Sequence, residues 1–174
     1  MEELKTFIRN IPDFPKKGIV FRDITTLIGN KEKFCLVVDK LAARYREKNV
    51  EYIVSVESRG FIFGAALSYA IGAGLVLVRK KGKLPADTYE VSYDLEYGKD
   101  TLEIHKDAFP KGAKVLLLDD LLATGGTTAA AIGLVEKLGG KIVEAAFVIE
   151  LEFLKGRDKI KGVPVFSLVK YDKE

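Results

Sequence analysis

The feature that most constrains the fold is a run of four apolar residues, Val115 to Leu118, that leads directly into an acidic pair. An apolar run of this kind indicates a strand covered on both faces, as in the centre of a parallel sheet. Asp119 and Asp120 then fall where that strand reaches solvent at its carboxyl end. Open α/β sheets bind their ligands at that edge, so the segment predicts both the sheet and the place of a binding site.

A turn suited to an anion follows the acidic pair. Gly125 and Gly126 lack a Cβ, so their backbone N–H groups can converge on an anion, and Thr124 and Thr127 add hydroxyl donors. Apolar residues then recur at helical spacing over 131–138, so the turn opens a helix whose N-terminus points partial positive charge at the same anion. Threonines and alanines follow the glycines where a nucleoside triphosphate P-loop has a lysine, so ATP binding by that route is not expected.

The acidic pair indicates what the anion is attached to. Carboxylates repel phosphate, but they accept hydrogen bonds well from two vicinal hydroxyls. A ribose 5-phosphate would therefore suit both the turn and the pair. The alternative for an isolated acidic pair is a solvated turn at a strand end, but the context of residues 115–128 favours the sugar phosphate.

Residues 115–128 resemble the phosphoribosyl pyrophosphate (PRPP) signature of the type I phosphoribosyltransferases, in the form typical of the adenine phosphoribosyltransferases. Other segments resemble landmarks of the same family, in the same order and over nearly the whole chain: residues 11–25, 57–61, 78–85 and 93–104. The resemblance implies a purine salvage enzyme that transfers the 5-phosphoribosyl group from PRPP to N9 of adenine, giving AMP and pyrophosphate. It also implies Mg²⁺ carried by PRPP without metal ligands from the protein, and a homodimer in which Arg79 reaches the neighbouring site.

Two other functions remain open. One is transfer to a 6-oxopurine, namely guanine, hypoxanthine or xanthine, which would reverse the donor and acceptor demands of the base pocket. The other is a non-catalytic PRPP-binding regulator. That class would need an attached DNA-binding module, for which a single domain leaves no room.

The resemblance assigns roles to individual residues. The phosphate and ribose of PRPP or AMP would contact Asp119, Asp120, Ala123, Thr124, Gly125, Gly126 and Thr127. Pyrophosphate would contact Arg59, Arg79, Lys80 and Lys83. Adenine would contact the ring of Phe21, the backbone of its neighbours and a closing side chain, which gives the set Val20, Phe21, Arg22 and Leu151. Glu96 would handle the proton as N9 reacts, Tyr97 would gate the pocket, and a non-proline cis peptide bond is expected between Glu57 and Arg59.

Several of these assignments have plain structural alternatives. Phe21 would otherwise be a core aromatic that anchors a loop, and Glu96 an ordinary exposed acid. Residues 80–103, rich in Gly, Tyr and charge with only short strand-like pieces, predict a flexible lid that excludes water, and a surface hairpin is the alternative. His105, the only histidine of the sequence, is expected to be structural.

The remaining pattern predicts one α/β domain over residues 1–174. Strands are expected at 52–56, 75–79, 114–119, 142–149 and 165–169. Helices are expected at 1–10, 32–48, 60–70, 126–138 and 151–160. Their alternation predicts a mainly parallel, doubly wound sheet with flanking helices, the type I phosphoribosyltransferase fold, preceded by a small base-binding hood over residues 1–30.

Composition disfavours several classes of protein. The single cysteine, Cys35, rules out an internal disulfide, fits a reducing compartment and is expected in a helix core. No apolar run is long enough to span a bilayer, and the start is acidic where a secretory signal is basic, so a cytoplasmic location is expected. A net charge of +3 with dispersed basic residues gives little support to nucleic-acid binding.

Overall fold

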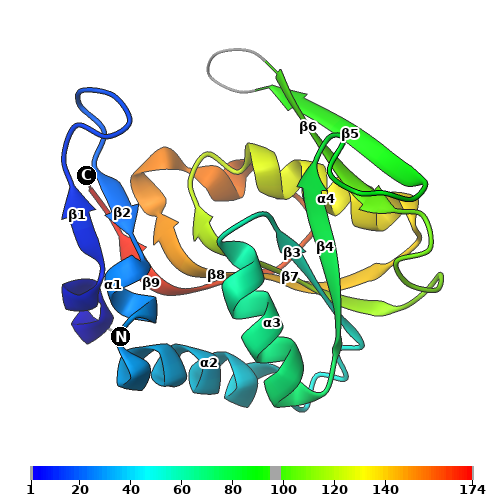
Figure 1. Cartoon of the computed structure of the whole chain (residues 1–174), viewed down its shortest axis with the longest axis horizontal. Coiled ribbons are helices and arrows are strands. Elements are labelled where there is room, and N and C mark those ends of the chain that lie inside the picture. Colours follow the sequence, from blue (N-terminus) through cyan, green and yellow to red (C-terminus); the bar gives the residue numbers. More distant parts are fainter. Residues whose placement is uncertain (1, 95–98, 174) are drawn as a thin grey trace.

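The computed structural model describes residues 2–94 and 99–173, and its centre is a seven-stranded sheet in the order β5-β6-β4-β3-β7-β8-β9 (Figure 1). The parallel strands are β3 (Tyr52–Val56), β4 (Gly74–Lys80), β7 (Lys114–Leu122), β8 (Lys141–Leu151) and β9 (Val165–Tyr171). Each overlaps its predicted range. The expected parallel sheet is therefore confirmed.

Residues 80–103 are more regular than their sequence suggests. β5 (Thr88–Asp94) and β6 (Lys99–His105) form an antiparallel hairpin, and β6 pairs with the end of β4. The expectation of only short strand-like pieces is wrong, because the polar positions of β6 alternate with Leu102 and Ile104, which are buried in the core beneath the hairpin. Glu96 and Tyr97 lie outside the described residues, and the role of the hairpin as a lid stays a prediction.

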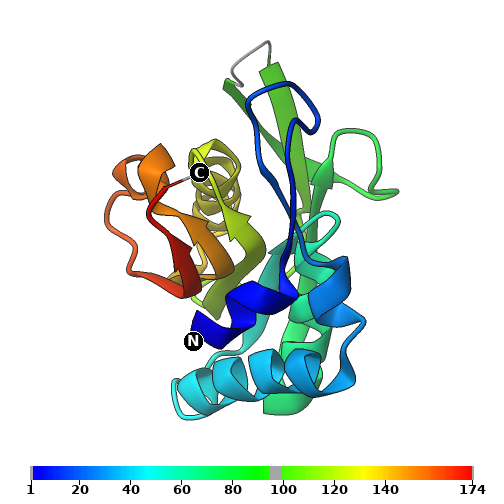
Figure 2. The ribbon, with the colours of Figure 1, turned by 90° about the vertical axis from the view of Figure 1, so that its left-hand side faces the viewer.

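The N-terminal segment forms a separate ribbon. The helix expected over 1–10 is shorter than predicted, because the chain turns from a 3₁₀ helix into strands: η1 (Glu2–Phe7), β1 (Arg9–Ile11), β2 (Phe21–Asp23) and the short α1 (Thr25–Ile28). β1 and β2 pair antiparallel in a sheet of their own, and the Arg9 guanidinium donates to the Asp23 carboxylate across the pair. This ribbon and the β5–β6 hairpin project from the same side of the molecule (Figures 1 and 2).

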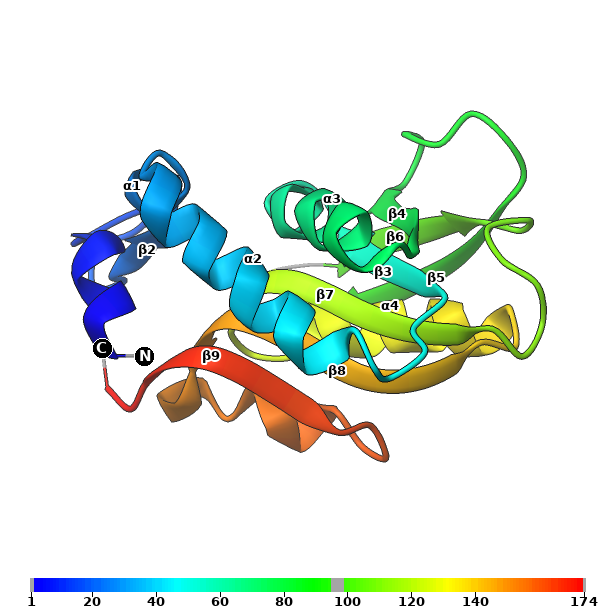
Figure 3. The ribbon, with the colours of Figure 1, turned by 90° about the horizontal axis from the view of Figure 1, so that it is seen from below.

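Helices cover both faces of the sheet (Figure 3): α2 (Lys31–Tyr45) and α3 (Gly60–Ile71) lie on one face, and α4 (Gly126–Lys137) lies on the other. Side chains alternate along each strand, so Ile53 and Leu116 join the core under α2 and α3, whereas Val54 and Leu117 join the core under α4. Strands that supply two cores read as continuous apolar runs, as β7 does. No helix within the described ranges is long and apolar enough to cross a bilayer.

The α-helix expected over residues 151–160 is wrong. β8 continues to Leu151, and two 3₁₀ turns follow, η2 (Glu152–Leu154) and η3 (Gly156–Lys159). An α-helix cannot pass through Lys155, because its φ of 52° is left-handed. The Arg157 guanidinium then anchors η3 by donating to both Glu150 carboxylate oxygens, at 2.5 and 2.6 Å.

The expected place of Cys35 in a helix core is also wrong, because this side chain is exposed. The buried face of α2 is formed by Val37, Leu41 and Tyr45, which repeat every four residues. Cys35 lies two positions before Val37, about 200° around the helix, so it falls on the opposite face.

Candidate active site

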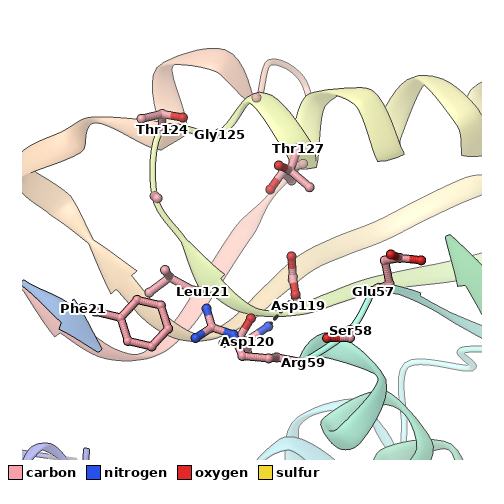
Figure 4. Close-up of a pocket in the computed structure, with 13 residues that line it drawn as sticks. Phe21, Glu57, Ser58, Arg59, Asp119, Asp120, Leu121, Thr124, Gly125 and Thr127 are labelled. Atoms are coloured by element: carbon pink, nitrogen blue, oxygen red, sulfur yellow. Dashed lines mark hydrogen bonds and ion pairs between the residues drawn. The ribbon is translucent and has the colours of Figure 1, made fainter. Parts of the chain in front are cut away.

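A cavity of about 440 Å³ opens at the carboxyl edge of the parallel sheet, where β3 and β7 end (Figure 4). Its walls come from β2, the loop after β3, the end of β7 and the turn into α4. Every residue that the sequence assigns to phosphate and ribose lines this cavity, from Asp119 and Asp120 to the turn 123–127. Phe21 and Arg59, from distant parts of the chain, line it as well.

The turn into α4 depends on close contact between two glycines, Gly125 in the turn and Gly156 in η3. Gly125 is the N-cap of α4 and has a φ of 80°, a left-handed conformation that favours glycine. A Cβ on Gly125 would collide with the carbonyl oxygen of Gly156 in η3, and a Cβ on Gly156 would collide with that of Ala123. The turn is therefore pressed backbone to backbone against η3, while the N-terminus of α4 forms part of the cavity wall.

The acidic pair is held at the end of β7. Asp120 is only 4% exposed, and its carboxylate lies 2.9 Å from Nε of Arg59. The Asp119 carboxylate accepts a hydrogen bond from the backbone N–H of Asp120, and a Cβ at position 60 would lie 2.7 Å from it, so Gly60 lets the start of α3 approach closely.

Burial and the neighbouring Asp120 carboxylate raise the pKa of Asp119 well above its ordinary value. Burial also raises the pKa of Asp120, although the charge of Arg59 opposes that shift. The pair therefore has a smaller tendency to ionise than two ordinary aspartates. The oxygens of the pair remain able to accept hydrogen bonds from hydroxyls.

Arg59 links the acidic pair to the aromatic wall. Its guanidinium carbon lies 5.0 Å from the centroid of the Phe21 ring, while its Nε pairs with Asp120. A cation in that position is attracted by the face of the ring. The side chain expected to bind pyrophosphate thus stands between the positions expected for base and ribose (Figure 4).

Of the other basic residues expected to bind pyrophosphate, Arg79 and Lys83 gather around Glu57, and neither they nor Lys80 line the cavity as the described residues form it. Glu57 accepts hydrogen bonds from Nε of Arg79 at 2.9 Å and from Nζ of Lys83 at 2.7 Å. Burial alone would raise the pKa of Glu57, but the hydrogen bonds from Lys83 and Arg79 lower it below its ordinary value. Lys80 pairs instead with Asp100 of the hairpin at 3.0 Å. Since Glu57 itself lines the cavity, it connects the Arg79 and Lys83 cations to that space.

The residues expected around adenine divide into two groups. Phe21 lines the cavity, whereas Val20, Arg22 and Leu151 are absent from its lining as far as the described residues extend. Leu151 belongs to the hydrophobic core on the α2 side. Val20 and Arg22 flank Phe21 in the chain, so their backbone groups lie next to the ring, and their reading of the base stays a prediction.

The cavity also contains side chains that sequence reasoning did not assign: Glu57, Ser58, Leu121 and Thr128. A signal for Glu57 was present, since a carboxylate two residues before Arg59 would be expected to organise nearby cations. The peptide bond between Glu57 and Ser58 is cis, which confirms the expectation for this loop.

Known proteins are similar to this chain in both sequence and fold. A model of the phosphoribosyl transferase domain matches residues 25–170. The adenine phosphoribosyltransferase of Geotalea daltonii is 57% identical over 171 residues, which cover 98% of this chain and all of the relative. The crystal structure of adenine phosphoribosyltransferase from Thermoanaerobacter pseudethanolicus matches with a TM-score of 0.95 and 50% identity, covering 98% of this chain and 99% of that one. The Saccharomyces cerevisiae enzyme, complexed with an imino-altritol bisphosphate and adenine, matches with a TM-score of 0.91 and 45% identity, covering 96% and 97%.

The domain match and the cavity at the sheet edge together define a phosphoribosyltransferase. Sequence identity above 50% over nearly the full length then points to one group within that class, the adenine phosphoribosyltransferases. The chain belongs to the adenine phosphoribosyltransferase family, as the segment 115–128 predicts.

Proposed function

We propose that this chain transfers the 5-phosphoribosyl group of PRPP to N9 of adenine, releasing pyrophosphate and forming AMP. The observation that carries the proposal is the single cavity that Phe21, the acidic pair and the glycine turn share. Each wall suits one part of AMP: the aromatic ring suits the base, the acidic pair suits the ribose hydroxyls, and the turn at a helix N-terminus suits the 5-phosphate. The relatives named above carry the same activity in their names.

PRPP meets three sets of groups in this arrangement. The turn 123–127 supplies backbone N–H groups and threonine hydroxyls to the 5-phosphate, and Asp119 and Asp120 accept hydrogen bonds from the ribose hydroxyls. Arg59, Arg79, Lys80 and Lys83 supply the positive charge that a leaving pyrophosphate requires.

Substrate binding then exchanges one set of ion pairs for another. Arg59 pairs with Asp120, Arg79 and Lys83 pair with Glu57, and Lys80 pairs with Asp100. Ribose hydroxyls donate hydrogen bonds to the Asp120 oxygens, and pyrophosphate pairs with the cationic side chains. Neither the Asp120 carboxylate nor the Arg59 guanidinium is then left without a partner.

The chemical step is displacement of pyrophosphate at C1 of PRPP by N9 of adenine, with inversion and a transition state that resembles an oxocarbenium ion. Phe21 stacks on the base, and the backbones of Val20 and Arg22 read its N1 and 6-amino group. Glu96 accepts the proton from the purine, and Tyr97 gates the pocket. Closure of the hairpin over the cavity excludes water, which would otherwise attack C1.

We infer that Mg²⁺ arrives with PRPP. Within the described residues, Glu57 and Asp120 already hold cationic side chains, and no cluster of three or more metal-ligating side chains is present. Mg²⁺ favours phosphate oxygens and retained waters over an all-protein cage. When bound, it neutralises the charge that develops on pyrophosphate.

We also propose a homodimer that forms through α3 and β4. Large apolar side chains on these elements point to solvent: Ile62, Tyr69, Leu75 and Leu77. Tyr69 is 93% exposed, which is unusual for a tyrosine that serves only its own chain. The patch continues along β4 to Arg79, the residue expected to reach the neighbouring site, so a second copy of the chain is the partner that explains both features.

A purine panel tests the function. Adenine, guanine, hypoxanthine and xanthine are each supplied with PRPP and Mg²⁺, and nucleotide formation and pyrophosphate release are measured. Turnover with adenine alone supports the proposal. Preference for a 6-oxopurine would keep phosphoribosyl transfer but overturn the base pocket at residues 20–22. Tight PRPP binding without turnover of any purine would indicate the non-catalytic regulator.

The Glu96→Gln variant tests the proton-handling role. Its kcat is expected to fall by about 100-fold or more while its Kd for AMP changes little, because general-base catalysis acts in the transition state. Asp119→Asn is the comparison, since it should chiefly raise the KM for PRPP. An equal loss of kcat and AMP affinity in Glu96→Gln would contradict the role.

A further inference from the structure

The β1–β2 ribbon is tied to the main sheet by side chains and not by strand pairing. Within the described residues it forms a two-stranded sheet of its own. Phe21, the first residue of β2, nevertheless lines the cavity together with Asp119 and Asp120 of β7. The separation between the base half and the ribose half of the cavity therefore depends on what holds β2 against the body.

Arg22 provides such a hold on the other face of β2. Side chains of consecutive strand residues point to opposite faces, so Arg22 points away from the cavity that Phe21 lines. Its guanidinium carbon lies 4.2 Å from the ring centroid of Tyr171, the last residue of β9. Arg22 is 6% exposed and Tyr171 is 9% exposed, so the contact is shielded from water.

Neighbouring groups from the same corner of the molecule support this contact. Nη1 of Arg22 donates to Oδ1 of Asn10 at 2.5 Å, which joins β1 to the same guanidinium. Nζ of Lys5 in η1 lies 5.1 Å from the Tyr171 ring. Two cationic side chains of the N-terminal segment therefore make cation–π contacts with the Tyr171 ring. Tyr171 itself belongs to the main sheet, because β9 pairs with β8.

The ring, and not the hydroxyl, makes this contact. The Tyr171 hydroxyl is buried and has no hydrogen-bond partner among the described residues. A phenylalanine at position 171 would keep the aromatic face and would lose no hydrogen bond within that part of the chain. An aliphatic residue would keep the apolar packing and lose the attraction for the guanidinium.

We infer that Tyr171 is a positioning residue for the base half of the site: by holding Arg22, it fixes where Phe21 and the adjacent backbone stand relative to Asp119 and Asp120. The inference rests on the proposed function, because it assumes that Phe21 and its neighbours bind adenine. It separates the two substrates, since the turn and acidic pair that bind PRPP have no part in the Arg22 contact.

Steady-state kinetics of Tyr171→Leu and Tyr171→Phe test the inference. We expect Tyr171→Leu to raise the KM for adenine by about tenfold while the KM for PRPP stays within about twofold of wild type. Tyr171→Phe should match wild type for both substrates. An unchanged KM for adenine in Tyr171→Leu, or equal increases for adenine and PRPP, would overturn the inference, because general destabilisation would not single out one substrate.

A double-mutant cycle with Arg22→Met adds an independent test. If Tyr171 acts through Arg22, the KM for adenine of the double variant should be no higher than that of the more impaired single variant. Additive losses in the double variant would contradict the coupling. Should Tyr171→Leu fail to fold, the same comparison of adenine and PRPP in Arg22→Met decides, with Arg22→Lys as the variant that keeps the charge. A wild-type protein that does not turn over adenine would remove the proposed function, an outcome distinct from a wild-type enzyme whose variants lack the selective effect.

Discussion

The contact between Gly125 and Gly156 is the tightest constraint on any single residue of the site. Neither position has room for a Cβ, because each faces a backbone carbonyl of the other segment. Flexible side chains can move out of the way of an added methyl group, but a carbonyl in a fixed turn cannot. Gly156 therefore serves the phosphate turn although it does not line the cavity within the described chain.

Gly156→Ala is expected to raise the KM for PRPP by about tenfold, because displacement of the turn 123–127 misplaces several donors to the 5-phosphate at once. Gly133→Ala is the matched control. It lies in α4, where a Cβ would meet only a methyl group of Val91 at 3.7 Å, and alanine favours a helix over glycine. Steady-state kinetics with PRPP as the varied substrate measure both variants. A wild-type KM for Gly156→Ala would show that the turn does not depend on η3.

Local sequence predicted the residues of the site that are consecutive in the chain. The acidic pair and the glycine turn could be placed because strand, turn and helix follow one another between residues 115 and 128. The partner of Arg59 could not be predicted, because Asp120 and Phe21 are brought to it only by tertiary packing. Gly156 was missed for the same reason, since its role depends on a carbonyl more than thirty residues earlier in the chain.

Among the secondary-structure elements, α2 and β8 share an ionic contact remote from the cavity. Glu144 of β8 accepts hydrogen bonds from the Arg44 guanidinium at 2.7 and 2.8 Å and from the Tyr45 hydroxyl at 2.6 Å. Its side chain is 7% exposed. Burial opposes ionisation, but the hydrogen bonds from Arg44 and Tyr45 lower the pKa of Glu144 from 4.5 to about 2.

This contact should make stability depend on acidity. A carboxyl whose pKa is lower in the folded state stabilises fully above its unfolded value of 4.5, and that contribution is lost as the pH falls toward 2. The free energy of unfolding of wild type minus that of Glu144→Gln should therefore shrink by up to about 3 kcal/mol between pH 7 and pH 2. Urea denaturation of both proteins across this range measures the difference. A difference that does not change with pH would contradict the lowered pKa.

Two elements differ from their predicted form for identifiable reasons. The β5–β6 hairpin was obscured by charged residues, because apolar side chains of β6 such as Leu102 alternate with polar ones. Among these is Glu103, which is buried but accepts hydrogen bonds from the backbone N–H groups of Lys83 and Leu84. The segment 151–160 has helical composition, yet Lys155 in a left-handed conformation breaks it into two turns. In the second case the packing of Gly156 against Ala123 overrides local propensity.

Several of the large apolar side chains that are exposed within the described residues gather on one face of the molecule. On this face, α3 and β4 expose Tyr69 and Leu75, while the charged ends of the same elements lead to Glu57 and Arg79. A dimer through this face would bring the Arg79 region of each subunit toward the other copy. The active site and the subunit interface would then be parts of one continuous structure.

Leu75→Glu is expected to convert a dimer into a monomer and to lower kcat/KM for PRPP by about tenfold or more, because a buried unpaired carboxylate opposes association and removes a trans contribution from Arg79. Leu154→Glu is the control, since Leu154 in η2 has the same 39% exposure as Leu75 and lies away from α3 and β4. Light scattering with size-exclusion chromatography gives the mass of each variant. A monomeric wild type, or a fully active monomeric variant, would contradict the proposed dimer and its shared active site.

The two halves of the cavity are assembled over different spans of the chain, and this has a consequence for folding. The walls proposed for the sugar phosphate come from residues 119–127 with support from Gly156, whereas the walls proposed for the base join Phe21 and Arg22, near the start of the chain, to Tyr171, near its end. Contacts between residues far apart in sequence must first offset a larger entropy of loop closure, so they tend to form late in folding. During refolding, the phosphate turn is therefore expected to become ordered before the ribbon that carries Phe21 docks against β9.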